Sequence, residues 1–498
     1  MEQKSIIIIG AGIAGLSAGC YGQMNDYRTQ IFELHYNPGG LCTSWEQKGY
    51  TINGCLHWLV GSNPANNFYR IWEELGAVQG RRMIDHEEFM RIEGANGKVF
   101  IVYTDIDRLE QHMKELAPQD KEVIEEFTKA LRACTCFNLP IERAPELYGP
   151  IDGLKPLFKL LPFLKVMRKW KKISVQDFAK RFSDSFLREA FPLSFDLPDF
   201  SMIGMLMTLA WMHNKAAGYP IGGSLEFSRA IEGRYLGLGG EIHYRSPVSK
   251  ILIENGQAMG VRLADGTEHQ GDIVISAADG HATIFDMLEE KYINDKIRGY
   301  YDKLPIFPPL VQVALGVART FEGLPPSIIY HLKEPVAIAG QERRTIGVEI
   351  HNFDPTLAPQ GKTVMKVMFP SDYDYWKKLK QDLVRYKAEK KQIADKVIAL
   401  LDQHFPGLAS QVEMCDVATP ITWERYTGNW RASFEGWLTT TKTFGMRMGK
   451  TLPGLKNFYM AGQWVEPGGG VPSAAMSGRN VIQIICKQDK KPFATKIP

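Results

Sequence analysis

The chain has 498 residues, which favours two domains, and its 44% hydrophobic and 23% charged residues are typical of a globular protein. A net charge of +3, with no basic block interleaved with aromatic residues, gives no indication of a nucleic-acid partner. The seven cysteines have no repeated spacing, so we expect reduced thiols in the cytoplasm and no metal site. No apolar run approaches the roughly 20 residues that cross a bilayer, so we expect no membrane span.

The first predicted element is a buried parallel strand at residues 5–9, an isoleucine-rich run that leads directly into glycines. The spacing of Gly10, Gly12 and Gly15 is typical of a dinucleotide-binding turn between a strand and a helix. Gly10 permits the tight turn, Gly12 lets the backbone approach a pyrophosphate, and Gly15 lets the helix pack closely on the strand. A pyrophosphate bound beside Ala14 would meet free amide groups at the positive end of the helix dipole.

Glu33 ends the second predicted strand, residues 29–32, at the distance from the glycine motif where a ribose ligand is expected. A carboxylate in that place accepts hydrogen bonds from the hydroxyl groups of an adenosine ribose. The alternative is a surface glutamate that ends a strand and has no ligand. The combination of a strand, a glycine motif and an acidic residue favours the ribose partner.

A glycine doublet, Gly39 and Gly40, comes next, and the segment around it resembles a flavoprotein superfamily that includes amine oxidases, phytoene desaturases and retinol saturases. In that superfamily the doublet places main-chain amide groups against the FAD pyrophosphate, and an arginine often follows. Here Leu41 and Cys42 follow the doublet. The resemblance therefore implies that Leu41 contacts the cofactor and that another residue replaces the arginine, with Thr43 as our candidate. A plain turn is the alternative.

The stretch at residues 49–58 indicates a branch of the superfamily, because it resembles the G-Y-x-x-D-x-G-x-H pattern of phytoene desaturases, carotenoid isomerases and retinol saturases. Asn53 stands where that pattern has aspartate. His57 is our candidate for a catalytic residue that handles a proton, since histidine titrates near neutral pH. The alternative is a structural histidine that is hydrogen-bonded to a loop. Trp58 is a candidate for the wall of the substrate cavity.

Residues 155–172 combine lysine and arginine with large apolar side chains and contain no acidic residue. Such a segment suits docking in the headgroup plane of an anionic bilayer, so we expect a cytoplasmic protein that associates peripherally with an anionic membrane surface. Pro156 and Pro162 predict short pieces rather than one long helix. The alternative is a basic loop that caps the substrate domain.

The middle of the chain is predicted to return to the dinucleotide domain. Gly222 and Gly223 open a predicted helix that ends near residue 238. Further strands are predicted at residues 241–244, 248–254 and 272–278. The resemblance implies that the backbone of Val248 meets the adenine. Tyr219, just before the predicted helix, is a candidate for the substrate cavity.

Further candidates for the cavity wall lie near the end of the chain. Residues 419–430 resemble the family's late strand beside the flavin, which implies that Tyr426 and Trp430 lie in the cavity. Ordinary core aromatics are the alternative. Glu466, in the glycine-rich segment that follows, is a weaker candidate for the same wall.

An apolar strand at residues 456–461 leads into a glycine-rich loop and a helix of small residues at 473–479. This arrangement resembles the C-terminal FAD signature of the same superfamily. Free amide groups at Val471 and beyond would stabilise the negative charge of a reduced flavin. Gln463 stands where the family usually has an acidic residue. The candidate cofactor contacts from this segment are Gly462, Gln463, Gly470, Val471 and Pro472.

The order of these elements predicts an α/β protein in which a Rossmann-like FAD-binding domain is discontinuous. The parts of that domain are predicted at residues 1–70, 218–290 and 446–498. The insertions at 71–217 and 291–445 are predicted to form an α+β substrate domain of mixed sheet and helices. Its clearest strands are predicted at residues 99–103, 310–317 and 363–369.

The resemblance implies an FAD-dependent oxidoreductase that acts on carbon–carbon double bonds of an apolar polyene or isoprenoid-like lipid. Saturation, desaturation and redox-assisted isomerisation would each use hydride exchange at flavin N5. Two alternatives are a flavin amine oxidase and a non-enzymatic carrier that resembles the Rab GDP-dissociation inhibitors. The intact Gly15, Glu33 and C-terminal glycines argue against a carrier, which needs no flavin site. The sequence indicates no electron partner and no oligomeric state.

Overall fold

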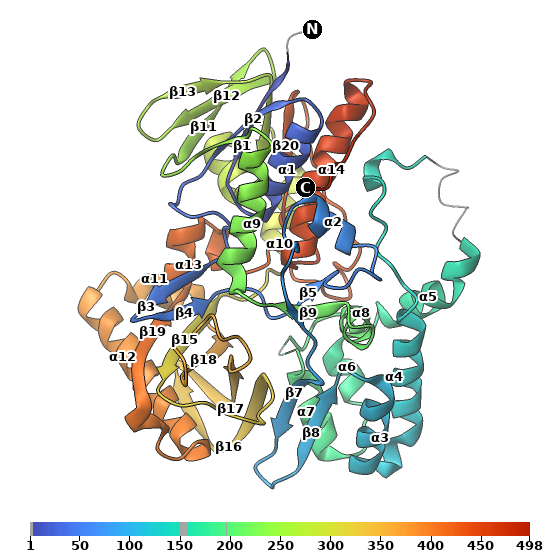
Figure 1. Cartoon of the computed structure of the whole chain (residues 1–498), viewed down its shortest axis with the longest axis vertical. Helices are drawn as coiled ribbons and strands as arrows, with labels where there is room; N and C mark the ends of the chain where they lie inside the picture. The colour runs from blue at the N-terminus through green and yellow to red at the C-terminus, as the bar shows by residue number, and fades with distance from the viewer. Residues whose placement is uncertain (1–2, 150–156, 196) are drawn as a thin grey trace.

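The upper half of the molecule in Figure 1 is built on a five-stranded parallel sheet of order β10-β2-β1-β14-β20. The structure is a computed structural model that describes residues 3–149, 157–195 and 197–498. The strands are β1 (Ser5–Ile9), β2 (Arg28–Phe32), β10 (Glu241–His243), β14 (Ile273–Ser276) and β20 (Phe458–Met460). The sheet therefore joins the start, the middle and the end of the chain, which confirms a discontinuous Rossmann-like fold.

Both faces of this sheet are covered. Helices α1 (Ile13–Met24), α9 (Gly223–Gly237) and α14 (Gly470–Gln488) cover one face, and the meander β11 (Val248–Glu254), β12 (Gln257–Leu263) and β13 (Glu268–Gln270) covers the other. Each face of the sheet therefore has its own hydrophobic core, and successive isoleucines of β1 point alternately into one core and the other. This explains why the strand is apolar throughout. Small residues bring α1 and α14 together, because a Cβ at Gly478 would lie 2.3 Å from the carbonyl oxygen of Ala14.

The lower half contains a seven-stranded mixed sheet of order β19-β15-β18-β17-β16-β7-β8 (Figure 1). Its neighbours are antiparallel except for the parallel pair of β16 and β7. The strands are β7 (Glu88–Glu93), β8 (Val99–Tyr103), β15 (Leu310–Val317), β16 (Ser327–Ile338), β17 (Gln341–Ile350), β18 (Thr363–Pro370) and β19 (Val412–Ala418). The mixed sheet predicted for the inserted part is thus confirmed, while the exact domain boundaries stay a prediction.

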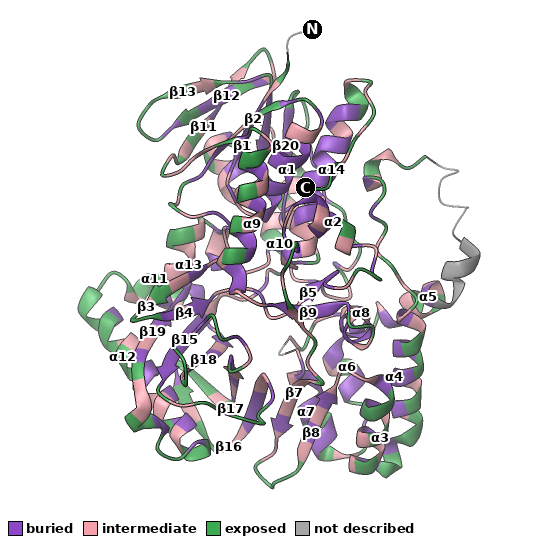
Figure 2. Cartoon of the chain, viewed as in Figure 1, coloured by how far each residue is buried: buried purple, intermediate pink, exposed green. Residues whose placement is uncertain are grey.

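Helices flank the mixed sheet on two sides (Figure 1). One group is α11 (Tyr373–Leu379) and α12 (Leu383–His404). The other is α3 (Ile106–Leu116), α4 (Lys121–Cys134), α5 (Leu157–Trp170), α6 (Val175–Ala179), α7 (Ser185–Leu193) and α8 (Met202–His213). Figure 2 shows exposed residues on the outer helices α3 and α12 and buried residues on the strands, as expected for amphipathic helices that pack on a core.

Short elements connect the two halves of the molecule. The hairpin of β3 (Ser44–Gln47) and β4 (Tyr50–Asn53) and the small sheet of β5 (Leu59–Val60), β9 (Ala217–Pro220) and β6 (Met83–Ile84) lie between the two larger sheets. The remaining α-helices with described bounds are α2 (Tyr69–Glu74), α10 (Asp295–Lys303) and α13 (Pro420–Thr427). Several candidate site residues lie on or next to these connecting elements.

The strand expected within residues 419–430 is wrong, because Pro420–Thr427 forms the helix α13. Thr419 and Thr422 make a reciprocal capping box at its start, and Pro420 occupies the first turn, where its missing N–H costs nothing. Gly428 ends the helix with a φ of 68°, a conformation that glycine adopts without strain. These start and stop signals are local, and they override the strand that the family resemblance implied.

The prediction that proline divides residues 155–172 into short pieces is also wrong, because α5 runs without a break from residue 157 to 170. A proline inside a helix removes one backbone hydrogen bond. Packing of the C-terminal half of the helix offsets this loss, since Phe163 stacks on Phe137 with ring centroids 3.9 Å apart and Trp170 is buried. Residues 155 and 156 lie outside the described part. Within that part, no helix has both the length and the hydropathy to cross a membrane.

Candidate active site

A cavity of about 780 Å³ has walls from both halves of the molecule. This volume is within the range of sites that enclose a small molecule or cofactor. Its lining includes these residues singled out from the sequence as cofactor contacts: Gly10, Gly12, Ala14, Glu33, Gly39, Gly40, Leu41, Gly462, Gln463, Gly470, Val471 and Pro472. It also includes the cavity candidates His57, Trp58, Tyr219 and Tyr426. The residues that do not line it are Gly15, Thr43, Val248, Trp430 and Glu466.

The glycine motif forms the wall at the N-terminus of α1. A Cβ at Gly12 would meet no protein atom within 4 Å, so the space above this residue is open. Gly15 has the opposite environment, because its Cβ would lie 1.9 Å from the carbonyl oxygen of Gly10. No side chain caps the first turn of α1, which leaves its amide groups for a ligand. This arrangement fits a pyrophosphate.

Glu33 lies beside this turn and is only 5% exposed. Its Oε2 accepts a hydrogen bond from the amide of Ala11 at 2.6 Å, and its Oε1 accepts one from the amide of His35 at 2.8 Å. Burial raises the pKa of the carboxyl group, while these backbone bonds lower it in part. A carboxylate fixed in this way on the cavity wall fits the hydroxyl groups of a ribose.

The glycine doublet packs directly on the motif. The amide of Gly39 donates to the carbonyl oxygen of Ala11 at 2.8 Å, and Gly39 pairs with Gly12 in a parallel β-bridge. Gly39 has a φ of +103°, and a Cβ there would lie 2.2 Å from the carbonyl oxygen of Cys42. The carbonyl oxygen of Thr43, the candidate phosphate partner, accepts from the amide of Gly54 at 3.0 Å in the β3–β4 hairpin, and a contact of Thr43 with a phosphate stays a prediction.

The C-terminal segment completes this end of the cavity with the glycines at 468–470 and the uncapped start of α14. Gln463 donates from Nε2 to Oδ1 of Asn429 at 3.3 Å. Glu466 turns away to an ion pair with Lys450 at 2.6 Å. The helix start offers free amide groups on the wall, which would stabilise negative charge on a bound flavin.

The opposite end of the cavity contains a partly buried ionic group that we call the Glu349 cluster: His57, Glu349, His351 and Lys366. Glu349 Oε1 pairs with His57 Nδ1 at 2.9 Å, and Glu349 Oε2 pairs with Lys366 Nζ at 2.9 Å. His351 Nε2 lies 3.4 Å from the same Oε2. All four residues line the cavity. The carboxylate of Glu349 is therefore shared by three basic side chains.

The strand register explains this cluster. Glu349 on β17 is paired directly with Lys366 on β18, so the two side chains share one face of the sheet. The side chain of Lys366 is completely buried. Burial opposes ionisation of Glu349, but the charges of His57 and Lys366 outweigh it and hold the pKa of this carboxyl well below its usual value.

Asn53 positions the loop that carries His57. Its Oδ1 accepts from the amide of Ser224 at 3.0 Å, and its Nδ2 donates to the carbonyl oxygen of Leu56 at 2.7 Å. An amide side chain performs both tasks at once, whereas an aspartate would lack the donor. The departure from the family pattern at this position thus has a structural reason.

A family model described as flavin containing amine oxidoreductase matches residues 13–486. The chain belongs to this family. The match covers both ends of the cavity, and the glycine motif, Glu33 and the two helix starts described above fit a flavin dinucleotide. The protein is therefore an FAD-dependent oxidoreductase, as its sequence predicted.

Curated relatives and solved structures agree with this family. The chain is 26% identical to the chloroplastic prolycopene isomerase of Daucus carota, with 96% of this chain and 79% of the relative covered. It is 24% identical to a neurosporene-forming phytoene desaturase of Cereibacter sphaeroides, with 96% and 94% covered. A putrescine oxidase variant has a TM-score of 0.63 at 14% identity, with 97% of this chain and 99% of that chain covered. An oxidoreductase from Methanosarcina mazei has a TM-score of 0.61 at 19% identity, with 96% and 100% covered. These structural likenesses establish the fold.

Two further polar groups of this flavoenzyme line the cavity. Tyr219 donates to Asp354 Oδ2 at 3.0 Å, and burial raises its pKa far above the usual value, so it stays a neutral phenol. Glu435 has no hydrogen-bond or ion-pair partner within the described ranges, and burial raises its pKa to about 7. Its Oε2 would lie 2.2 Å from a Cβ at Gly469, which places the carboxyl group beside the C-terminal glycine loop.

Sequence reasoning did not identify Glu349, His351, Lys366 or Glu435. Lys366 carried a usable signal, because a lysine in the middle of the apolar run at residues 363–369 is unusual for a buried strand. Glu435 carried none, since a single glutamate between Phe434 and Gly436 belongs to no motif.

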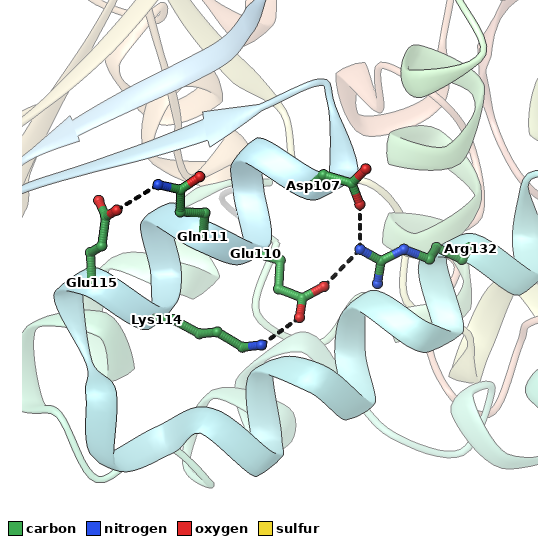
Figure 3. Close-up of a pocket in the computed structure, with 6 residues that line it drawn as sticks. All are labelled: Asp107, Glu110, Gln111, Lys114, Glu115 and Arg132. Carbon is green, nitrogen blue, oxygen red and sulfur yellow. Dashed lines mark hydrogen bonds and ion pairs between the residues drawn. The ribbon is translucent and has the colours of Figure 1, made fainter.

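A second hollow, shown in Figure 3, lies on the surface between α3 and α4. Arg132 pairs there with Asp107 at 2.5 Å and with Glu110 at 2.7 Å, and Lys114 pairs with Glu110 at 2.6 Å. These charged side chains pair with one another at the solvent-exposed surface, so the hollow is a surface ion-pair network and not a ligand site. In the part of the chain that the structure describes, no group of three or more potential ligand side chains is arranged to hold a metal ion.

Proposed function

We propose that this flavoenzyme acts on carbon–carbon double bonds of an apolar polyene or isoprenoid-like lipid, by saturation, desaturation or redox-assisted isomerisation. The observation that carries this proposal is the apolar lining of the cavity beyond the dinucleotide end. It includes Trp58, Phe89, Phe195, Phe200, Trp211 and Phe444. The names of the relatives, an isomerase and a desaturase of carotenoids, support the same substrate class.

An amine substrate is the second candidate. A protonated amine needs a carboxylate that is free to pair with it, and Glu349 is already neutralised by His57 and Lys366. Glu435 is the feature that favours an amine, because it lines the cavity without a partner among the described residues. A polyene needs no charge partner and fits the rest of the lining.

The chain's own contribution to the reaction is positioning and proton handling. Bound FAD supplies the two-electron hydride chemistry. Glu349 accepts a hydrogen bond from His57 Nδ1, which orients the imidazole and leaves Nε2 as the nitrogen that exchanges a proton. In saturation, the alkene carbon next to the one that accepts hydride takes a proton from His57; in desaturation the proton returns. The free amide groups at the start of α14, from residue 470, would stabilise negative charge on bound FAD.

Anaerobic incubation of the purified holoenzyme with a panel of polyenes and a panel of amines tests the proposal. With a polyene we expect a change in the flavin absorbance or a product that chromatography separates from the substrate. With putrescine and cyclohexylamine we expect no flavin reduction. Flavin reduction by an amine, together with unchanged polyenes in both flavin redox states, would falsify the proposal.

We further propose that the protein is cytoplasmic and docks on an anionic membrane surface through the basic segment at residues 155–172. Lys165, Arg168 and Lys172 are exposed on and after α5 and support docking. Phe163 and Trp170 pack inward, so they are not available to the bilayer, and Lys169 already pairs with Glu126 at 2.7 Å. Among the side chains of this segment that the structure describes, the exposed ones that support docking are therefore basic.

Sedimentation with anionic liposomes tests the docking proposal. Replacing Lys165, Arg168 and Lys172 with glutamine should reduce pelleting strongly, because each basic residue near an anionic surface contributes about 1 kcal/mol. The matched control is the triple glutamine variant of Lys377, Lys378 and Lys380, which removes the same charge from α11 and its end. Equal pelleting of the two variants would contradict docking through this segment.

A further inference from the structure

Two cysteines face each other between the two ends of the cavity. In the β3–β4 hairpin, Ser44 is paired with Asn53, and the amide of Gly54 donates to the carbonyl oxygen of Thr43 at 3.0 Å. Cys42 and Cys55 lie just beyond this pairing, in bends before β3 and after β4, and their thiols are hydrogen-bonded to each other. A disulfide, which joins Cα atoms about 4.4–6.8 Å apart, requires such proximity. Both residues line the cavity.

The two thiols, which we call the thiol pair, join the two ends of the cavity. Cys42 is 3% exposed and lies two residues after the glycine doublet, and the hydroxyl of Ser228 donates to its carbonyl oxygen at 2.6 Å. Cys55 is less buried, and the charges of Lys366 and Glu435 both act on its thiol. The thiol of Cys55 is therefore within reach of one charge from the Glu349 cluster and one from the side of the C-terminal glycine loop.

The environment makes the two thiols unequal. Burial opposes ionisation of Cys42, but hydrogen bonds from Cys55 and Ser228 outweigh it and lower the pKa of Cys42. The hydrogen bond to Cys42, together with burial, raises the pKa of Cys55 well above its usual value. In thiol–disulfide exchange the sulfur with the lower pKa is the better leaving group. The hydrogen bond from Cys55 exists only while both residues are thiols, whereas Ser228 and Ser224 stay beside Cys42 in the disulfide and lower its pKa as well. An incoming thiolate would therefore attack the more accessible Cys55 and expel the thiolate of Cys42.

The other cysteines lack this arrangement. Burial raises the pKa of both Cys20 and Cys134 to about 12, as expected for inert buried thiols. Cys136 is exposed, and Cys415 lies on β19 with a pKa that burial raises to about 11. Burial also raises the pKa of Cys486, and none of Cys136, Cys415 and Cys486 lines the cavity.

We propose that Cys42 and Cys55 form a redox pair that passes two electrons from an external dithiol to the bound flavin. The dithiol opens the Cys42–Cys55 disulfide by exchange and leaves as its own cyclic disulfide, so both protein thiols are regenerated. When the pair closes again, the new S–S bond forms as each thiol loses one proton and one electron. These two electrons and two protons reduce oxidised FAD. The structure thereby assigns a class of electron donor to this oxidoreductase.

Two measurements on the holoenzyme test this redox pair. The holoenzyme is first oxidised mildly with diamide and its remaining thiols are alkylated. Mass spectrometry should then detect a peptide in which Cys42 is linked to Cys55, and this measurement does not depend on turnover. Under anaerobic conditions, dithiothreitol should then bleach the visible flavin absorbance. In Cys42→Ser and Cys55→Ser, bleaching should be at least about tenfold slower, since neither variant closes the disulfide.

The Cys415→Ser variant is the control, because this residue lies away from the cavity and should keep both signals. The flavin content of each variant is measured first, and Cys55→Ala serves as a second variant where serine disturbs folding. Absence of the linked peptide, or unchanged bleaching in both cysteine variants, overturns the proposal. Polyene conversion by enzyme reduced with dithionite is measured in parallel. Because dithionite reduces the flavin directly, this conversion tests the proposed function and does not involve the thiol pair. Failure of the thiol-pair proposal is therefore distinguished from failure of the proposed function.

Discussion

The two ends of the cavity are built from different parts of the polypeptide. The dinucleotide end consists mainly of backbone: glycines without a Cβ, two uncapped helix starts and one fixed carboxylate, Glu33. The other end consists of side chains that meet from different elements, such as His57 after β4 and Lys366 on β18. Backbone sites depend on local sequence and tolerate few substitutions, whereas a side-chain cluster depends on strand register and long-range packing.

The largest effect should come from breaking the side-chain end. In Lys366→Met, Glu349 loses its buried cation, and removal of one partner of a buried ion pair costs about 3–5 kcal/mol of unfolding free energy. Chemical denaturation measures this loss. Lys362→Met is the control, because its ion pair with Glu413 is exposed and contributes at most about 1 kcal/mol. Equal losses in the two variants would show that the cluster is not a buried ionic unit.

The second effect is on turnover. His57→Ala should lower turnover per bound flavin by about 10²–10⁴-fold, because it removes a positioned proton donor. The FAD content should stay near that of the parent, since the dinucleotide contacts lie at the other end of the cavity. Turnover is measured with a polyene that the parent converts, and His112→Ala, outside the cavity, is the control. Unchanged activity per flavin would remove His57 from the reaction.

The third effect is on cofactor affinity. Glu33→Ala should weaken FAD binding by about 1.5–3 kcal/mol, the usual contribution of a hydrogen bond to a charged group. Fluorescence titration of apoprotein with FAD measures it. Glu241→Ala, on the exposed edge strand β10 of the same sheet, should bind FAD as the parent does. Parent-like affinity in Glu33→Ala would show that this carboxylate is not the ribose ligand.

The smallest effect is a pH dependence at Glu435, whose pKa is raised by burial from 4.5 to about 7. A carboxyl group whose pKa is raised in the folded state stabilises the fold while it is protonated. This contribution is lost as the pH rises from the pKa of the unfolded state to the pKa of the folded state. As the pH rises from 5 to 8, the Tm of the parent should therefore fall relative to the Tm of Glu435→Gln. Thermal scans across this range measure the difference, and parallel Tm curves would show that Glu435 titrates normally.

The same contrast explains what could be predicted from the sequence. The glycine motif, Glu33 and the doublet are local patterns whose geometry follows from the absence of a Cβ, so the FAD site and the discontinuous fold were predictable. The Glu349 cluster was not, because pairing of β17 with β18 cannot be read from either strand alone. The strand expected at residues 419–430 failed for a different reason: the helix start signals at Thr419 and Pro420 were present but were outweighed by the family resemblance.

The packing of α14 on α1 and of β20 on β14 has a consequence for how the enzyme matures. While the chain is being synthesised, the edge of β14 has no neighbour and the apolar side of α1 stays uncovered until residues 458–488 emerge. The cofactor site needs the glycines at both ends of the chain. We therefore expect FAD capture to follow the docking of residues 458–488 on β14 and α1, and the chain to present an open sheet edge until that docking has taken place.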